Sequence, residues 1–148
     1  TMSGIEPSLL EMEVTESFIM NDPERWIALL KQMQALGVSI AIDDFGTGHS
    51  SLSYLRKLPI DKLKVDMSFV KDIPQREDAC AIVNSIIDLA QNMKIATLAE
   101  GIETKEQEHY LQEHGCEQGQ GYLYAKPMNV KDLKVWMMNR HKESCKNQ

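Results

Sequence analysis

Short apolar runs alternate along the chain with longer segments in which apolar and polar residues recur at helical spacing. Apolar runs rich in branched side chains predict buried strands, whereas apolar residues three or four positions apart predict helices. The predicted strands are Leu9–Val14, Val38–Ile42, Leu63–Val65, Ile95–Ala99 and a weaker one at Glu117–Gly121. The predicted helices are Pro23–Leu36, Ser51–Leu58, Glu77–Asn92, Lys105–His114 and Asn129–His141.

Capping residues support several of these boundaries. Asn21 or Asp22 can cap the helix that begins at Pro23, because Asn and Asp accept hydrogen bonds from first-turn amides and proline suits the first helical position. Pro59 ends the short helix before it, and Asn129 can cap the last helix. Each predicted helix is therefore bounded by residues that favour a start or a stop.

The order strand then helix, repeated five times with short connections, predicts parallel strands joined by right-handed crossovers. Two architectures fit this order, a doubly wound open sheet and part of a (β/α)8 barrel. Polar residues follow nearly every predicted strand, which favours the barrel, because an open sheet concentrates its site at one switch point. A complete barrel needs about 250 residues. We therefore expect a partial (β/α)8 TIM-type barrel, the C-terminal part, over residues 1–141, with a flexible tail at 142–148.

Composition and charge narrow the function. The 148 residues carry a formal net charge of −6, which argues against a broad surface for a nucleic-acid polymer. An acidic chain can still bind phosphate esters through divalent cations and a few lysines, for which Lys64 and Lys126 are candidates. Three cysteines without metal-ligand spacing favour a reducing compartment. No apolar stretch approaches the roughly 18 residues that span a bilayer, so we expect a cytoplasmic segment without membrane contact.

Asp43 and Asp44 stand directly after the predicted strand Val38–Ile42, and Gly46 and Gly48 follow. Two adjacent carboxylates at one strand end repel each other unless a cation or a basic group neutralises them. The alternative is an ordinary surface turn, for which Asp and Gly are also typical. Other polar residues lie at or beyond strand ends, namely Glu13, Glu16, Lys64, Asp66, Glu100, Glu103 and Gln120. Their repetition predicts one convergent site.

Four segments carry a resemblance to a known family. They are Glu13 to Ser17, DDFGTGHSSLSYLRKLPIDKLKVD from Asp43 to Asp66, AEGIET from Ala99 to Thr104, and QGYLYAKP from Gln120 to Pro127. In order and spacing they resemble the C-terminal part of an EAL domain, the bacterial module that hydrolyses cyclic di-GMP to linear pGpG. The resemblance implies a two-metal site for Mg2+ or Mn2+. Such a site activates water and stabilises charge on the phosphoryl oxygens.

The resemblance also assigns roles near the metals. Glu13 and Asp43 resemble ligands of the first metal, and Asp43 with Asp44 resembles the ligand pair of the second. Lys64 resembles the lysine that hydrogen-bonds the attacking water, although an ordinary ion pair is the alternative. Glu100 resembles either the general base or a further metal-linked group, and both roles stay open.

The remaining assignments concern the substrate and the loops. Asp66 resembles a residue on the side of the second metal, and Gln120 a residue near the substrate. Glu103 resembles the glutamate that anchors the Asp43–Ser50 loop and supports dimer-linked regulation. Lys126 and Pro127 can touch a substrate phosphate, or form a plain turn. His49 in the Asp43–Ser50 loop is expected to be a polar loop residue rather than a ligand.

The chain departs from the family in its metal ligands. It contains neither the Glu-Ala-Leu motif nor an asparagine at a strand end, so two ligands implied by the family have no counterpart. We therefore expect little or no hydrolysis by these residues alone. A five-strand sheet also has two unpaired edges, which predicts a homodimer or a larger oligomer.

Two other functions are weighed against catalysis. A degenerate EAL-like module could bind cyclic di-GMP or a protein without hydrolysis, although nothing in pure binding requires so many site residues. Another Mg2+-dependent barrel, such as an enolase-like lyase, would share the strand-end carboxylates but would not predict the GTGHSSLSYLRKLP loop. The residues preceding this segment in a parent protein would discriminate, and an upstream cyclase or sensor domain there stays open.

Overall fold

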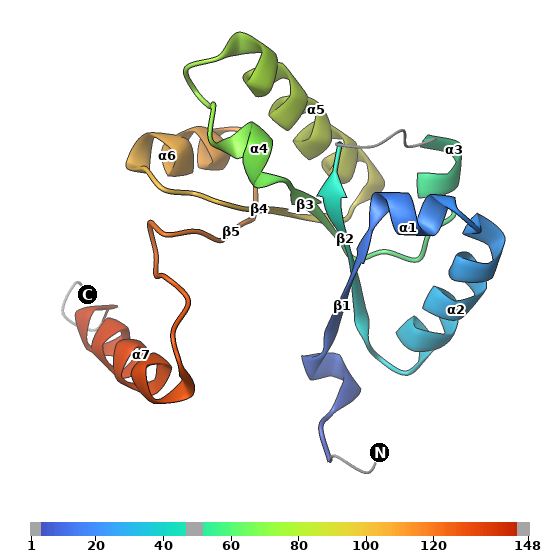
Figure 1. The fold of residues 1–148 in the computed structure, drawn as a ribbon, viewed down its shortest axis with the longest axis horizontal. Helices are drawn as coiled ribbons and strands as arrows, with labels where there is room; N and C mark the ends of the chain where they lie inside the picture. Colours follow the sequence, from blue (N-terminus) through green and yellow to red (C-terminus); the bar gives the residue numbers. More distant parts are fainter. Residues whose placement is uncertain (1–3, 47–51, 145–148) are drawn as a thin grey trace.

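The computed structural model describes residues 4–46 and 52–144 as a sheet of five parallel strands with helices around it (Figure 1). The strands are β1 (Glu11–Thr15), β2 (Ser39–Phe45), β3 (Lys62–Val65), β4 (Ala96–Ala99) and β5 (Gln118–Gly119). They lie side by side in the order in which they occur in the chain. The predicted α/β class and the parallel topology are therefore confirmed.

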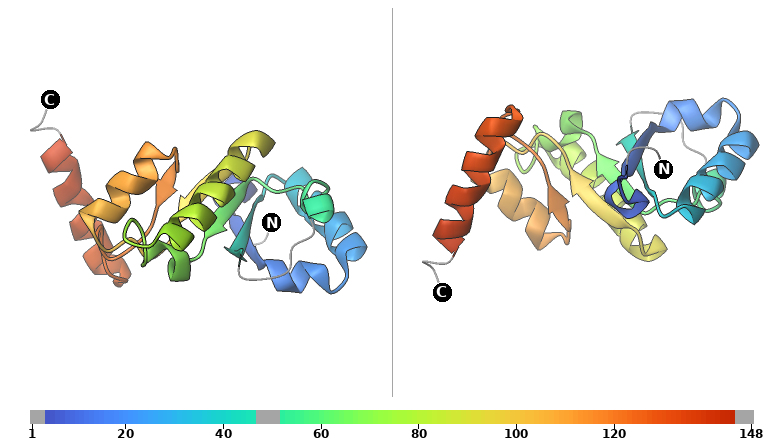
Figure 2. Two further views of the ribbon diagram at one scale, coloured as in Figure 1. Left: turned by 90° about the horizontal axis from the view of Figure 1, so that it is seen from above. Right: turned by 90° about the horizontal axis from the view of Figure 1, so that it is seen from below.

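Helices connect the strands and follow the last one. They are α1 (Glu16–Met20), α2 (Pro23–Ala35), α3 (Leu52–Leu55), α4 (Met67–Val70), α5 (Glu77–Met93), α6 (Lys105–Glu113) and α7 (Val130–Ser144), with a 3-10 turn at Pro7–Leu9. Figure 2 shows α7 at the end of the molecule away from α2. In the described part of the chain, no helix is both long enough and apolar enough to cross a membrane.

The two faces of the sheet differ in chemistry. On β3, Leu63 and Val65 are fully buried in the core, whereas Lys62 and Lys64 alternate with them and point to the other face. Leu63 and Val65 belong to one core cluster together with Ile40 of β2 and Ile87 of α5. One face of the sheet thus holds the core, and the other is free to carry functional side chains.

Several predicted boundaries shift in the structure. The chain over Pro7–Leu9 forms a 3-10 turn, so the first strand begins at Glu11 rather than Leu9. The second strand runs to Phe45 rather than Ile42, because it continues through an irregular register against β3. Helices α1 and α4 were not predicted, and α3 is shorter than Ser51–Leu58. The last helix extends to Ser144, beyond His141, and residues 145–148 lie outside the described part.

The predicted caps can be checked atom by atom. Asp22, not Asn21, caps α2, since its carboxylate accepts a hydrogen bond from the Arg25 amide at 3.4 Å. Asn129 Oδ1 accepts from the amides of Lys131 and Asp132 at 3.0 and 3.1 Å. Short polar side chains therefore start both helices, as the sequence predicts.

Candidate active site

The ammonium group of Lys64 on β3 lies among three carboxylates. Its Nζ is 2.8 Å from Glu13 Oε2, 3.0 Å from Asp43 Oδ1 and 2.8 Å from Glu100 Oε1. The partners come from β1, from β2 and from the residue that follows β4. An ammonium has three N–H donors, so each carboxylate takes one of them. Four of the predicted residues therefore meet at one point.

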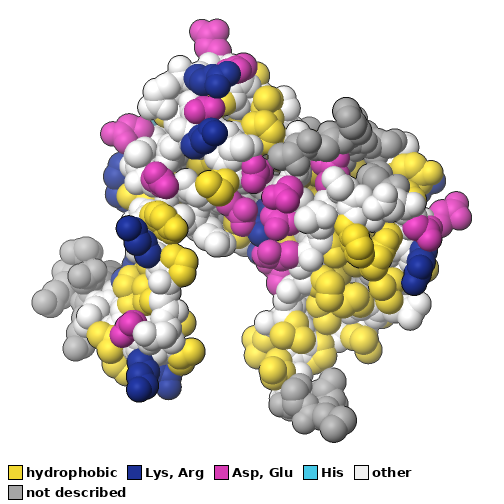
Figure 3. Space-filling view, in the orientation of Figure 1, with side chains coloured by type: hydrophobic (Ala, Val, Ile, Leu, Met, Phe, Trp, Pro, Cys, Tyr) yellow, Lys and Arg dark blue, Asp and Glu magenta, His cyan; other side chains and the backbone are white. Residues whose placement is uncertain are grey.

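The parallel register explains this convergence. β1 pairs with β2, β2 with β3, and β3 with β4, so their carboxyl ends lie along one rim of the sheet. The Glu100 amide extends the pairing by donating to the Val65 carbonyl at 3.1 Å. Figure 3 shows acidic side chains gathered in the middle of the molecule with basic side chains between them. The rim is therefore an acidic surface with a lysine at its centre.

Lys64 is almost completely buried, with 4% of its side chain exposed. Burial by itself lowers the pKa of the ammonium, but the hydrogen bonds that it donates to Glu100, Glu13 and Asp43 outweigh this effect and raise the pKa above its ordinary value. Lys64 therefore stays protonated across the neutral range. It holds three carboxylate oxygens at fixed positions around its nitrogen.

Asp44 lies next to this cluster in an unusual backbone conformation. Its φ is 54°, in the left-handed region that Asp tolerates better than most residues, and the register between β2 and β3 shifts between Ile42 and Phe45. The Asp44 amide donates to Asp43 Oδ1 at 3.1 Å. Partial desolvation, followed by the charges of Asp43 and Asp66, raises the pKa of Asp44. Asp66 itself caps α4 by accepting from the Ser68 amide at 3.0 Å. Asp44 therefore lies near two like charges.

Glu16, at the start of α1, supports the turn that follows Asp44. Its side chain is buried, and its Oε2 accepts a hydrogen bond from the Gly46 amide at 3.2 Å. The sequence showed Glu16 only as a strand-end carboxylate, and the anchoring role was assigned to Glu103. The loop in question reaches residues 47–50, which with His49 lie outside the described part, so the Glu103 assignment stays a prediction. Within the described residues, Glu16 makes the contact with Gly46.

Glu103 and Gln120 line a cavity beside the cluster. This cavity has a volume of about 230 Å³ and is lined by Met67, Glu100, Gly101, Glu103, Gln120, Gly121 and Tyr122. The Gln120 amide donates to the Ala99 carbonyl at 2.9 Å, and its carbonyl accepts from the Ile102 amide at 3.0 Å. The backbone of Gln120 is thus fixed against the loop that carries Glu100.

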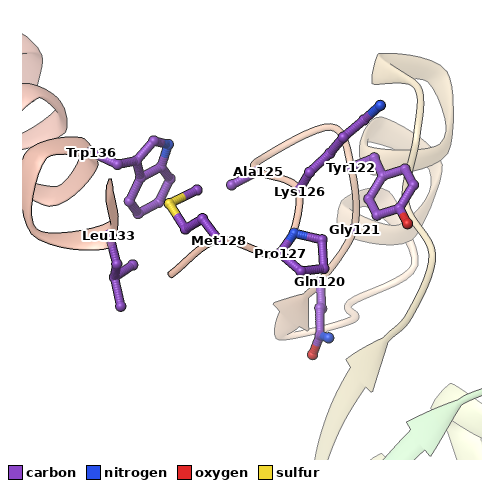
Figure 4. Close-up of a pocket in the computed structure, with 9 residues that line it drawn as sticks. All are labelled: Gln120, Gly121, Tyr122, Ala125, Lys126, Pro127, Met128, Leu133 and Trp136. Carbon is purple, nitrogen blue, oxygen red and sulfur yellow. The ribbon is translucent and has the colours of Figure 1, made fainter. Parts of the chain in front are cut away.

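Lys126 and Pro127 lie in a second cavity, of about 430 Å³, which Gln120 also lines (Figure 4). Figure 4 shows Met128, Leu133 and Trp136 on its other side. The ammonium of Lys126 lies 5.3 Å from the centre of the Tyr122 ring, a cation–π distance. Lys126 and Pro127 are therefore separate from the Lys64 cluster, and Gln120 lies between the two cavities.

The chemistry of the cluster fits a divalent metal. Glu13, Asp43 and Glu100 contribute three negative charges and Lys64 one positive charge, which leaves −2. Carboxylate oxygens are hard ligands that suit Mg2+ or Mn2+. Among the described residues, no three His, Cys, Asp or Glu side chains are arranged as a metal-binding group. In this arrangement the Lys64 ammonium provides the counter-charge.

The family model of the EAL domain matches residues 1–127. This chain belongs to the EAL domain family. The resemblance seen in the four sequence segments is therefore confirmed, and so is the partial barrel, because the similar solved structures are EAL domains of which the chain covers only a part.

Three proteins similar to this EAL chain are either named for cyclic di-GMP or solved in complex with it. The cyclic di-GMP phosphodiesterase NbdA of Pseudomonas aeruginosa is 45% identical over 135 residues, which are 91% of this chain and 17% of NbdA. The PaMucR phosphodiesterase in complex with cyclic di-GMP is 42% identical with a TM-score of 0.86, over 89% of this chain and 53% of that one. The manganese and cyclic di-GMP complex of Klebsiella pneumoniae BlrP1 is 36% identical with a TM-score of 0.77, over 85% of this chain and 32% of that one. The chain thus spans a minor part of NbdA and BlrP1 and about half of the PaMucR structure.

Proposed function

We propose that this EAL chain is part of a metal-dependent phosphodiesterase that hydrolyses cyclic di-GMP to linear pGpG in bacterial second-messenger signalling. The observation that supports the proposal most is the contact of Lys64 with Glu13, Asp43 and Glu100 at one rim of the sheet. Similar proteins named as cyclic di-GMP phosphodiesterases support the substrate.

Glu13, Asp43 and Asp44 would hold the Mg2+ or Mn2+ ions, since they are hard oxygen ligands in an acidic environment. Such ions make water nucleophilic at neutral pH and stabilise charge on phosphoryl oxygens. Lys64 stays protonated and orients the carboxylates. If one carboxylate rotated away to bind a metal ion, the N–H group that it leaves would be able to donate a hydrogen bond to a bound water. Glu100, hydrogen-bonded to Lys64, is suited to accept a proton or to hold a further ligand.

The substrate would lie along the same rim. Gln120 lines the cavity next to Glu100 and also the cavity that contains Lys126 and Pro127, so it connects the acidic cluster with a basic side chain. Asp66 and Glu103 border the rim on the α4 and α6 sides. A dinucleotide with two phosphates could then be held by the cluster at one phosphate and by Lys126 at the other.

The experiment that tests this function measures hydrolysis and binding of cyclic di-GMP with Mg2+ or Mn2+. We expect weak or no turnover by these 148 residues alone, because the Glu-Ala-Leu glutamate and the strand-end asparagine are absent from them. The deciding test therefore uses a chimera, namely the PaMucR phosphodiesterase in which the matched segment is replaced by this chain.

Turnover by the chimera, lost with Asp43→Asn and kept with Asp88→Asn, would support the proposal. Asp88 is a matched control because it lies exposed on α5 away from the rim. Binding of the dinucleotide without turnover by a folded chimera would instead support the binding-module alternative. A folded chimera that neither binds nor hydrolyses the dinucleotide would contradict both the catalytic proposal and the binding-module alternative.

A further inference from the structure

Gln107 is one of four polar residues that are buried in the described part of the chain, with 6% of its surface exposed. Lys64 and Glu16, two of the others, belong to the candidate site or to its turn. Gln107 is in the third position of α6, on the loop side of that helix. A buried amide has to be hydrogen-bonded to be tolerated, so its partners show what it holds together.

The side chain of Gln107 binds on two sides. Its Oε1 accepts from the Glu103 backbone amide at 2.8 Å and from the Thr104 backbone amide at 3.0 Å. The backbone amide of Gln107 donates in turn to Thr104 Oγ1 at 3.2 Å, which closes a capping box. Its Nε2 donates to the Lys71 carbonyl at 3.4 Å, 36 residues away. The capping box is local, whereas the contact with Lys71 joins two separate elements.

Lys71 is the C-terminal cap of α4, and Asp66 is the N-terminal cap of the same short helix. Asp66 is one of the charges that raise the pKa of Asp44. The single turn of α4 therefore runs from the acidic rim to the carbonyl that Gln107 binds.

The loop between β4 and α6 is held at its other points by backbone contacts. The Glu100 amide donates to the Val65 carbonyl, and the Ile102 amide donates to the Gln120 carbonyl. Gly101 approaches α4 so closely that a Cβ built on it would lie 2.6 Å from Met67 Cβ. At the Glu103 end, the backbone amides of Glu103 and Thr104 both donate to Gln107 Oε1.

We propose that Gln107 is a positioning residue of the candidate site, joining the loop that carries Glu100 and Glu103 to the end of α4 and so fixing Glu100 against Lys64. This proposal rests on the proposed function only for its catalytic consequence. The positional part concerns the chain itself, and it can be tested without substrate.

Three variants separate the two halves of the contact. Gln107→Glu keeps an oxygen for the Glu103 and Thr104 amides, as a capping box with Glu does, but it removes the donor to the Lys71 carbonyl. Gln107→Ala removes both. Gln112→Glu is the matched control, because it makes the same chemical change at an exposed position of α6.

The measured signals are the 1H–15N NMR resonance of the Lys64 ammonium without divalent metal, the exchange rates of the Glu103 and Thr104 amides, and the thermal unfolding midpoint. We expect Gln107→Glu to shift the Lys64 resonance while the Glu103 amide stays protected. Gln107→Ala should shift the same resonance and speed exchange of both amides by about tenfold. Gln112→Glu should change none of these signals.

A Lys64 resonance that stays in place in folded Gln107→Glu and Gln107→Ala would overturn the proposal. If neither variant folds, exchange in the unaltered chain decides, because the proposal requires Glu103 to be as protected as Glu100. Much faster exchange at Glu103 would then refute it. Hydrolysis and binding of cyclic di-GMP by the PaMucR chimera, measured in parallel, report separately on the proposed function.

Discussion

The buried carboxylate of Glu16 lies 3.2 Å from the amide of Gly46 and accepts its hydrogen bond, although 30 residues separate the two in sequence. Gly46 has a φ of 95° and follows Asp44 by two positions. Glu16 therefore fixes the backbone turn through which the chain leaves the acidic rim.

Replacing Glu16 should show how strongly this turn depends on it. We expect Glu16→Ala to lower the free energy of unfolding by about 1–3 kcal/mol, because the Gly46 amide loses its buried acceptor. Glu16→Gln keeps an acceptor oxygen and should cost less. Urea unfolding of the three proteins measures the difference, and equal stability of Glu16→Ala and the unaltered chain would contradict the anchoring role.

Lys64→Met should destabilise the metal-free chain by about 2–3 kcal/mol, since Glu13, Asp43 and Glu100 lose their shared cation. The pKa of Lys64 is raised in the folded state, so its contribution is complete below the ordinary value of 10.5 and is lost as the pH rises past the raised value. Urea unfolding at neutral pH without divalent metal measures this loss.

Lys62→Met is the control for Lys64→Met. Lys62 lies two residues earlier on the same face of β3 and pairs with one carboxylate, Glu11, at 2.6 Å. Its removal should cost less than about 1 kcal/mol, as is usual for a single partly exposed pair. Equal losses for the two variants would show that the three-carboxylate arrangement adds nothing.

Asp44→Asn should stabilise the metal-free chain at neutral pH by no more than about 1 kcal/mol, the range for exposed charges. Partial desolvation and the charges of Asp43 and Asp66 raise the pKa of Asp44, so the ionised form is disfavoured in the folded state. The gain should shrink as the pH falls and vanish at about pH 3, below the ordinary pKa of 3.8, because Asp44 is then largely protonated in the unfolded state as well as in the folded state. Urea unfolding at both pH values tests this, and a gain that persists in acid would contradict the charge explanation.

Gly101→Ala should destabilise the chain more than Gly4→Ala. Both glycines have a φ of 69°, so both variants bear the cost of a left-handed alanine, about 1–2 kcal/mol. A Cβ at Gly4 meets nothing within 4 Å, whereas one at Gly101 would lie 2.6 Å from Met67 Cβ. Thermal unfolding of the two variants isolates the steric part, and equal midpoints would show that Met67 can move aside.

The edges of the sheet predict association. β1 and β5 each pair with one neighbour among the described residues, and Leu9, Leu10 and Met12 near β1 are exposed. We expect a dimer or a larger species of these 148 residues by light scattering. A monomer at high concentration would contradict this expectation.

Sequence reasoning predicted which candidate residues lie together better than it predicted the contacts that support them. Periodicity and caps predicted five parallel strands, and strand-end polarity predicted that Glu13, Asp43, Lys64 and Glu100 would converge. Helices α1 and α4, of five and four residues, escaped because so short a segment shows no helical period. The bond from Gly46 to Glu16 and the contact of Gln107 with Lys71 depend on how distant elements pack, which no local pattern specifies.

The alternation along β3 separates two kinds of evolutionary constraint within four consecutive residues. Leu63 and Val65 pack in the core, while Lys62 and Lys64 meet carboxylates on the other face. A substitution at Leu63 or Val65 changes packing, whereas a substitution at Lys62 or Lys64 changes charge. The strand can therefore diverge in its chemistry while the scaffold is conserved, or repack its scaffold while the chemistry is kept.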